Sequence, residues 1–187
     1  MDGSSICSES RRRDPAGCVV SVLLLAAIAA VTAAHAQQPA RDIKKYTNAS
    51  WRWSIAYPAR WTVESDYPGL VRIHSTADNA LCSIHSGPMD RFNTVDELTD
   101  FLVTHDEKLL NEKGQKFVVL ARRRIVLPNG MVGNDVLVEI GPGGRSRRLH
   151  VLADGRGFAI DCEAYTKHWS RLDAPYRRII ASFTPAK

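Results

Sequence analysis

The sequence has few of the features that mark specialised classes of protein. Glycine (12 of 187 residues) and proline (9) are not enriched, which excludes collagen-like and low-complexity chains. Four cysteines are too few for a domain held together by disulfides alone. The excess of 25 basic over 20 acidic residues is too small to imply nucleic-acid binding. The remaining balance, 44% hydrophobic and 24% charged, is that of an ordinary globular chain of one domain, or of one domain plus a tail.

Long hydrophobic runs are missing too, except for one near the N-terminus. Arg11–Arg13 precede the apolar run Cys18–Ala34, which ends in the small-residue motif Ala34-His35-Ala36. This order is typical of a secretory signal peptide. We therefore expect cleavage after Ala36 and a periplasmic or secreted protein. The alternative is an uncleaved anchor, because the run is near the lower length limit for a membrane span.

The rest of the chain has no convincing internal boundary. We expect a signal peptide over 1–36, a flexible lead-in over 37–45 and a single domain over 46–187. Cys82 and Cys162 are the only cysteines that remain after cleavage. In an oxidising compartment an even pair favours a disulfide, and the alternative is two separate buried thiols.

One helix is expected in the middle of the domain. Thr94 and Glu97 have the spacing of a capping box. Apolar residues follow at helical spacing and predict a single buried face: Leu98, Phe101, Leu102, His105 and Leu109. Gly114 can end this helix. A second, short helix near the C-terminus has an apolar stripe of Tyr176, Ile179, Ile180 and Phe183.

Alternating patterns predict strands before and after the central helix, and turn signals set their pairing. We take the loops as Asn129-Gly130, Gly141–Gly144 and Asp154-Gly155. This register places Arg124 opposite Asp135 and Asp135 opposite His150. It also places His150 opposite Ala159 and Arg148 opposite Asp161.

The same register sorts the hairpin side chains onto two faces. The polar face carries Arg122, Arg124, Asp135, Glu139, Arg148, His150, Asp161 and Glu163. The apolar face carries Ile125, Val132, Val136, Val138, Leu149, Val151, Phe158, Ile160 and Cys162. The predicted fold class is α+β: an antiparallel β-sheet of hairpins, with a central helix and a short C-terminal helix packed on one face.

Two local motifs resemble those of the PsbP-like family. The segment WSIAYPARW at 53–61 is similar to its opening motif F-S-I-x-Y-P-x-x-W, and IIASF at 179–183 is similar to its closing motif I-x-x-S-F. The resemblance covers about 46–184. It implies a small exported or lumenal domain that serves as a binding or assembly module, usually without catalysis. It implies no particular functional residue in this chain.

No catalytic residue, metal ligand or cofactor site is predicted. None of the histidines after the signal segment falls in a tight ligand spacing: His74, His85, His105, His150 and His168. A G-x-S-x-G nucleophile motif is missing as well.

The candidate binding residues are basic and aromatic. Arg122, Arg124 and Arg148 share the polar face with His150 and could grip a carboxylate or phosphate. The alternative is a solvated face whose arginines pair with Asp135, Asp161 and Glu163 across the strands. Trp51 and Trp53 are predicted in the first place to be core residues. The alternative is that they form an interaction edge.

These observations favour an exported, non-enzymatic binding or assembly module of a bacterial-type cell envelope. The alternative is a binder of a small anionic ligand at the Arg-rich sheet face, and a third possibility is an envelope hydrolase. The expected partner is an envelope protein or a small anionic ligand. Nucleic acid is not expected, and membrane contact is expected only through an uncleaved signal segment.

Overall fold

The computed structural model describes residues 42–67 and 69–186. The predicted signal peptide lies outside these residues. The described domain starts earlier than expected, because its first strand begins at Ile43, within the segment predicted as a lead-in.

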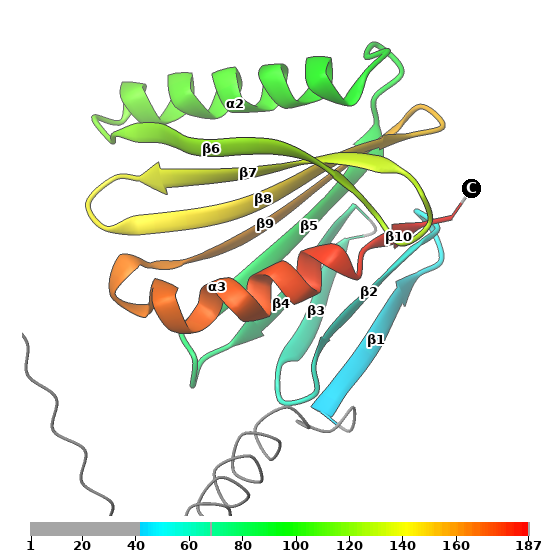
Figure 1. The fold of residues 1–187 in the computed structure, drawn as a ribbon, viewed down its shortest axis with the longest axis horizontal. Helices are drawn as coiled ribbons and strands as arrows, with labels where there is room; N and C mark the ends of the chain where they lie inside the picture. Colours follow the sequence, from blue (N-terminus) through cyan, green and yellow to red (C-terminus); the bar gives the residue numbers. More distant parts are fainter. Residues whose placement is uncertain (1–41, 68, 187) are drawn as a thin grey trace, which may run out of the picture. The chain divides into compact units, whose positions relative to one another are not determined.

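Two antiparallel sheets and two helices make up the described domain (Figure 1). The elements in chain order are β1 (Ile43–Asn48), β2 (Trp53–Pro58), β3 (Thr62–Tyr67), β4 (Leu70–Ser75), β5 (Ala80–Pro88), α2 (Val95–Glu112), β6 (Phe117–Val126), β7 (Val132–Ile140), β8 (Gly144–Ala153), β9 (Arg156–Tyr165), α3 (Thr166–Ala181) and β10 (Thr184–Pro185). The small sheet has the order β1-β2-β10. The large sheet has the order β3-β4-β5-β9-β8-β7-β6. The predicted α+β class, with a central and a C-terminal helix, is confirmed.

The two helices cover opposite faces of the large sheet. Arg147 and Arg148 are neighbours in β8 and therefore point to opposite sides. Arg148 pairs with Asp106 of α2, whereas Arg147 pairs with Asp173 of α3. The expectation that both helices pack on one face was therefore wrong. The sequence pattern predicts that the polar sheet face is open to solvent, but α2 is acidic and packs against this face.

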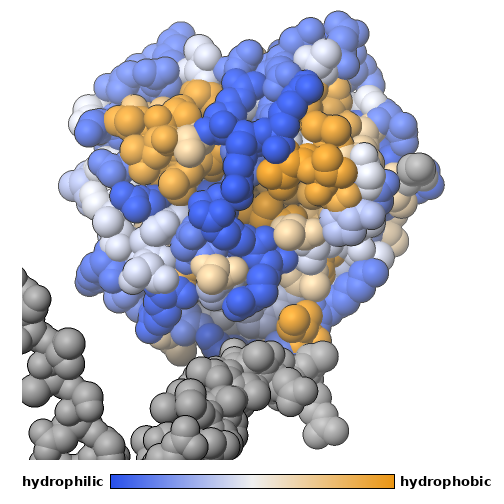
Figure 2. All heavy atoms as spheres, viewed as in Figure 1, coloured by the Kyte–Doolittle hydropathy of each residue, from blue (hydrophilic) through white to orange (hydrophobic). Residues whose placement is uncertain are grey.

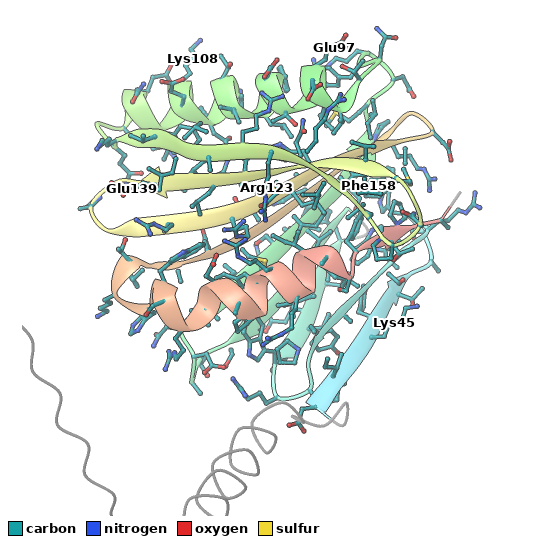
Figure 3. All side chains as sticks on the ribbon, in the orientation of Figure 1. Lys45, Glu97, Lys108, Arg123, Glu139 and Phe158 are labelled. Atoms are coloured by element: carbon teal, nitrogen blue, oxygen red, sulfur yellow. A yellow bond between two sulfur atoms is a disulfide. The ribbon has the colours of Figure 1, made fainter. Side chains whose placement is uncertain are left out.

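The main hydrophobic core lies between the large sheet, the small sheet and α3. Its largest fully buried side chains are Trp53, Tyr176, Phe158 and Phe183. Cys82 and Cys162 stand opposite each other in β5 and β9 and form a disulfide with an S–S distance of 2.06 Å (Figure 3). The predicted pairing of these cysteines is confirmed.

The predicted register holds for one hairpin and shifts by one residue in the others. In β8 and β9, His150 is opposite Ala159 and Arg148 is opposite Asp161, as expected. Strand β7 is displaced, because Arg124 is opposite Asn134 and Asp135 is opposite Leu149. Asp135 therefore faces α3, away from His150.

Loop length explains the displacement of β7. Leu127 pairs with Met131 through a 2.8 Å backbone hydrogen bond, which leaves a three-residue loop. Pro128 suits the first central position of a type I turn that starts at Leu127, and Gly130, at φ 82°, supplies the left-handed residue after the two central ones. The next loop also has three residues, since Ile140 pairs with Gly144. The turn signals predict two residues for the first of these loops and four for the second.

The central helix is turned about its axis relative to the prediction. Its capping residue is the expected one, because Thr94 Oγ1 accepts a hydrogen bond from the Glu97 amide. Its buried residues, however, are Val95, Leu98 and Thr99, while Phe101 and Leu109 are exposed. The rotation turns Asp96 and Asp106 toward arginines of the sheet.

Candidate binding site

The Arg-rich face predicted as a binding surface lies under α2. Arg122 donates hydrogen bonds to Asp96 and Asp100 on the first turns of this helix. Arg124 Nη2 lies 2.6 Å from Asp96 Oδ2. Both guanidinium groups are therefore paired with carboxylates of the chain itself.

Arg148 is paired as well, and it is buried. Its side chain is 7% exposed and pairs with Asp106 of α2. Its Nε also lies 3.2 Å from Asp161 Oδ2 of β9. The guanidinium thus joins the sheet to the middle of α2. Because it is already paired with two carboxylates, Arg148 is not available to an anionic ligand.

His150 is a core histidine of the interface between α2 and the sheet. It is 2% exposed, and its Nδ1 lies 3.2 Å from Thr99 Oγ1. Burial lowers its pKa to about 3, and the charges of Arg148 and Arg122 act in the same direction. His150 is therefore neutral at physiological pH.

Asp135 belongs to a separate ion-pair network on the α3 side. It accepts from Arg147, with Nη1 2.7 Å from Oδ2, and from Arg123 at 2.8 Å. Arg147 also reaches Asp173 of α3 at 2.9 Å. Of the three acids expected opposite the arginines, only Asp161 accepts from one of the predicted binding residues. The other acidic partners come from α2, whose position the sequence did not reveal.

The two tryptophan candidates contribute mainly to the core. Trp53 is 2% exposed, and its Nε1 donates a 2.9 Å hydrogen bond to Ser86 Oγ. Trp51 is half-buried and packs against the main core. Its carbonyl accepts a hydrogen bond from Arg156 Nη1. The first hairpin therefore presents little of these rings to a partner.

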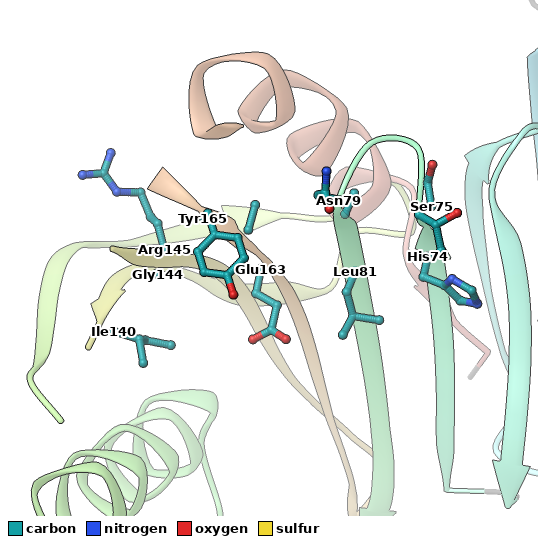
Figure 4. A pocket seen from close by; sticks show the side chains of 12 residues that line it. His74, Ser75, Asn79, Leu81, Ile140, Gly144, Arg145, Glu163 and Tyr165 are labelled. Carbon is teal, nitrogen blue, oxygen red and sulfur yellow. The ribbon is translucent and has the colours of Figure 1, made fainter. Parts of the chain in front are cut away.

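The part of the same sheet face that α2 leaves uncovered forms an open groove. Helix α2 packs on β6, β7 and β8. Beyond it, His74 of β4, Leu81 of β5 and Glu163 of β9 lie side by side in register. A cavity of about 460 Å³ opens there (Figure 4). It is lined by His74, Ser75, Thr76, Asn79, Ala80, Leu81, Ile140, Gly144, Arg145, Glu163, Ala164 and Tyr165.

Glu163 is the distinctive polar group of this groove. Its side chain is exposed to the cavity, and no described residue forms a hydrogen bond or an ion pair with its carboxylate. Partial burial raises the pKa of this carboxyl, and the charge of Asp161 raises it further, while Arg148 opposes the shift. Arg148 does not reach Glu163, because it is already shared by Asp106 and Asp161.

Apolar and aromatic groups flank this carboxylate. Tyr165 is 63% exposed and lies on the same side of β9 as Glu163, two residues away. Leu81 and Ile140 supply apolar surface on either side (Figure 4). Arg145 points away from Glu163, and its Nη2 lies 3.5 Å from Glu139 Oε2.

A further exposed surface runs along the outer strand β6. Val119, Leu120 and Val126 are exposed there, the last of them by 74%. On the side seen in Figure 1, apolar side chains gather in two patches separated by a hydrophilic band (Figure 2). Three arginines stand in the middle of β6, which discourages edge-to-edge pairing of sheets.

No helix within residues 42–67 and 69–186 is long and apolar enough to cross a membrane. In the same part of the chain, no three His, Cys, Asp or Glu side chains gather as metal ligands would.

Comparison with known proteins identifies the fold. No protein-family model and no curated protein matches the sequence. The solution structure of cyanobacterial PsbP (CyanoP) from Synechocystis sp. PCC 6803 is similar, with a TM-score of 0.63 and 13% identity over 80% of this chain and 96% of that one. The crystal structure of a protein of unknown function from Pseudomonas aeruginosa, described as a putative regulator, is similar with a TM-score of 0.54 and 11% identity over 78% of this chain and 98% of that one. The chain therefore has a PsbP-like fold, as the sequence motifs predicted.

The sequence pattern does not predict the groove. It predicts that Glu163 pairs with arginines, because its strand position puts it on the same sheet face. Glu163 has no partner because Arg148 on this face is shared by Asp106 of α2 and by Asp161. The sequence pattern does not specify where α2 lies, so it does not predict which acid of the sheet is left unpaired.

Proposed function

We propose that the chain is an exported, non-enzymatic accessory module of the cell envelope, and that it binds its partner in the groove beside α2. The observation that carries this proposal is the open cavity with its unpaired Glu163. Its volume of about 460 Å³ falls within the range of about 300–1,000 Å³ typical of ligand sites.

Export is supported by the signal-like N-terminal order and by the disulfide. Structural disulfides persist in oxidising compartments and are rare in the cytosol. N-terminal sequencing of the protein isolated from cells should begin at Gln37. A full-length protein recovered from the cytoplasm with free Cys82 and Cys162 would contradict this part of the proposal.

The Arg-rich face is a weaker candidate for binding than the groove. An anionic ligand at Arg122 or Arg148 would have to displace the aspartates of α2 that these residues already bind. The groove needs no such rearrangement, because its floor is open in the structure.

A pair of matched substitutions tests the groove. Leu81→Trp fills the cavity, whereas Leu109→Trp places the same ring on exposed α2. Tagged proteins would be used to capture partners from the envelope fraction, after melting curves show that both variants fold. We expect the wild type and Leu109→Trp to capture the same component and Leu81→Trp to lose it. Undiminished capture by Leu81→Trp would move the site elsewhere.

A further inference from the structure

The charges lining the groove differ in how far they are already satisfied. Arg145 is paired with Glu139, and its side chain points away from Glu163 (Figure 4). His74 Nε2 lies 3.1 Å from Glu64 Oε1. Within the described residues, His74 Nε2 and Arg145 Nε are buried and make no hydrogen bond, although both side chains have an acidic neighbour. Glu163 is the one carboxylate among the described residues that line the groove, and no described residue contacts it by hydrogen bond or ion pair. The groove therefore offers an incoming ligand a carboxylate that has no ion-pair partner.

The side chains around Glu163 can contact the apolar part of an organic cation as well as its charged group. Leu81 and Ile140 can cover an alkyl chain, and Tyr165 presents an exposed aromatic ring. Ammonium and guanidinium groups are attracted to the faces of such rings. Lys167 Nζ already lies 5.8 Å from the centre of the Tyr165 ring, so the chain itself places an ammonium group there.

We infer that the groove receives an organic cation, an ammonium or guanidinium group carried on an apolar stem, with Glu163 as its counter-ion. The inference rests on the proposed function of the same groove and adds the chemistry of the ligand. The cation can come from a basic side chain of a partner protein or from a free amine, because both present the same head and stem.

The carboxylate must be ionised to act as the counter-ion. Partial burial and the neighbouring Asp161 raise the pKa of Glu163. Binding should therefore weaken on acidification at a higher pH than it would for an ordinary exposed glutamate, and the bound cation should favour release of the Glu163 proton.

The direct test is an NMR titration of the ¹⁵N-labelled protein with n-butylammonium chloride, with n-butanol as a neutral probe of the same shape. We expect butylammonium to shift the amide signals of Leu81, Gly144 and Ala164, and butanol to leave them in place. Glu163→Gln should weaken butylammonium binding about 10-fold or more, because the contact to a charged acceptor is lost. Glu107→Gln on exposed α2 is the matched control and should bind as the wild type does. Equal shifts with both probes, or unweakened binding by Glu163→Gln, would overturn the inference.

Two further probes distinguish the sources of the cation. The peptide acetyl-Ala-Lys-Ala-amide represents a basic side chain of a partner, and spermidine represents a free amine. Tighter binding of the peptide than of butylammonium supports a protein partner, and tighter binding of spermidine supports a small amine. Failure of both to displace butylammonium would contradict a cation site.

The envelope capture experiment separates this inference from the proposed function. Loss of capture by both Leu81→Trp and Glu163→Gln supports both statements. Loss by Leu81→Trp alone contradicts the role of Glu163 and leaves the groove as the binding surface. Capture retained by both variants contradicts both.

Discussion

Individual charged side chains in this domain are buried as pairs and not singly. Arg147 and Asp135 are the clearest case, since their side chains are 5% and 4% exposed and lie 2.7 Å apart. Taking such ions out of water costs several kcal/mol each, which only close pairing offsets. The sequence suggested paired charges on this sheet, but it assigned Asp135 to the wrong face.

Removing one member of this pair should therefore be costly. We expect Asp135→Ala to lower the free energy of unfolding by about 3 kcal/mol, because Arg147 then keeps only Asp173 as its counter-ion. Arg177→Ala serves as the control, since it removes an exposed pair with the same Asp173 and should cost about 0.5 kcal/mol. Urea titrations of the two variants give the comparison. Equal losses of unfolding free energy in the two variants would show that burial of an ion pair does not determine the cost of breaking it.

The buried His150 predicts a pH dependence. Its pKa is lowered from 6.5 to about 3 in the folded protein, so the unfolded chain binds a proton that the folded one excludes. The resulting stability is complete above about pH 6.5 and is lost as the pH falls from there toward 3, by about 1.4 kcal/mol per pH unit. The ring ¹³C shift of His150 should keep its neutral value from pH 8 to about pH 4. A titration midpoint near 6.5 would contradict its burial against Thr99.

The two helices are held on the sheet by different forces. Helix α3 buries Trp169, Leu172 and Tyr176 along its apolar stripe, whereas α2 buries little more than Val95 and Leu98. The partly buried Val103 and Leu110 also pack against a small apolar cluster of the sheet, Phe117, Val136 and Val138. Ion pairs and hydrogen bonds to the sheet add to this attachment of α2. The hydrophobic pattern predicted both helices, but it placed the wrong face of α2 inward because it does not include the polar contacts that also orient this helix.

Salt should therefore loosen α2 more than α3. Raising the salt concentration from about 0.1 M to about 1 M shortens the Debye length from about 10 Å to about 3 Å and screens the exposed pairs of Asp96 and Asp100. We expect amide hydrogen exchange in α2 to accelerate relative to α3, whose apolar contacts are not screened. Equal changes in both helices would contradict a polar attachment.

Turn chemistry explains which pairings the sequence could predict. Asp154-Gly155 forms the expected two-residue loop, with both residues at positive φ, and the register of β8 and β9 follows from it. Both loops that flank β7 have three residues, against the predicted two and four. Each difference shifts β7 by one residue, so β6 and β8 keep their predicted alignment with each other. Arg124 and His150 consequently share a face as predicted, although the residue between them is Asn134.

The disulfide joins distant parts of the chain. Cys82 and Cys162 are separated by 80 residues, and both are completely buried. The bond connects β5 and β9 at the centre of the large sheet, between the half that carries α2 and the half that ends at β3. Their pairing was predictable from the cysteine count and the expected compartment, but the sequence pattern did not show that β5 and β9 are neighbours in the sheet.

Loss of this bond should destabilise the whole domain. The double variant Cys82→Ala, Cys162→Ala should lose about 4 kcal/mol of unfolding free energy, as the chain-entropy estimate for a long loop suggests. The wild type should also resist reduction until it unfolds, because solvent does not reach either sulfur. A variant with unchanged urea midpoint would contradict this role.

We propose that partners bind at the groove beside α2 and not at the arginines beneath this helix. Photo-crosslinking in intact cells tests it most directly, with the photoreactive residue at Thr76 on the groove or at Arg124 beside the helix. We expect a specific adduct from position 76 that Leu81→Trp abolishes, and no adduct from position 124. An adduct from position 124 alone, unaffected by Leu81→Trp, would contradict binding in the groove.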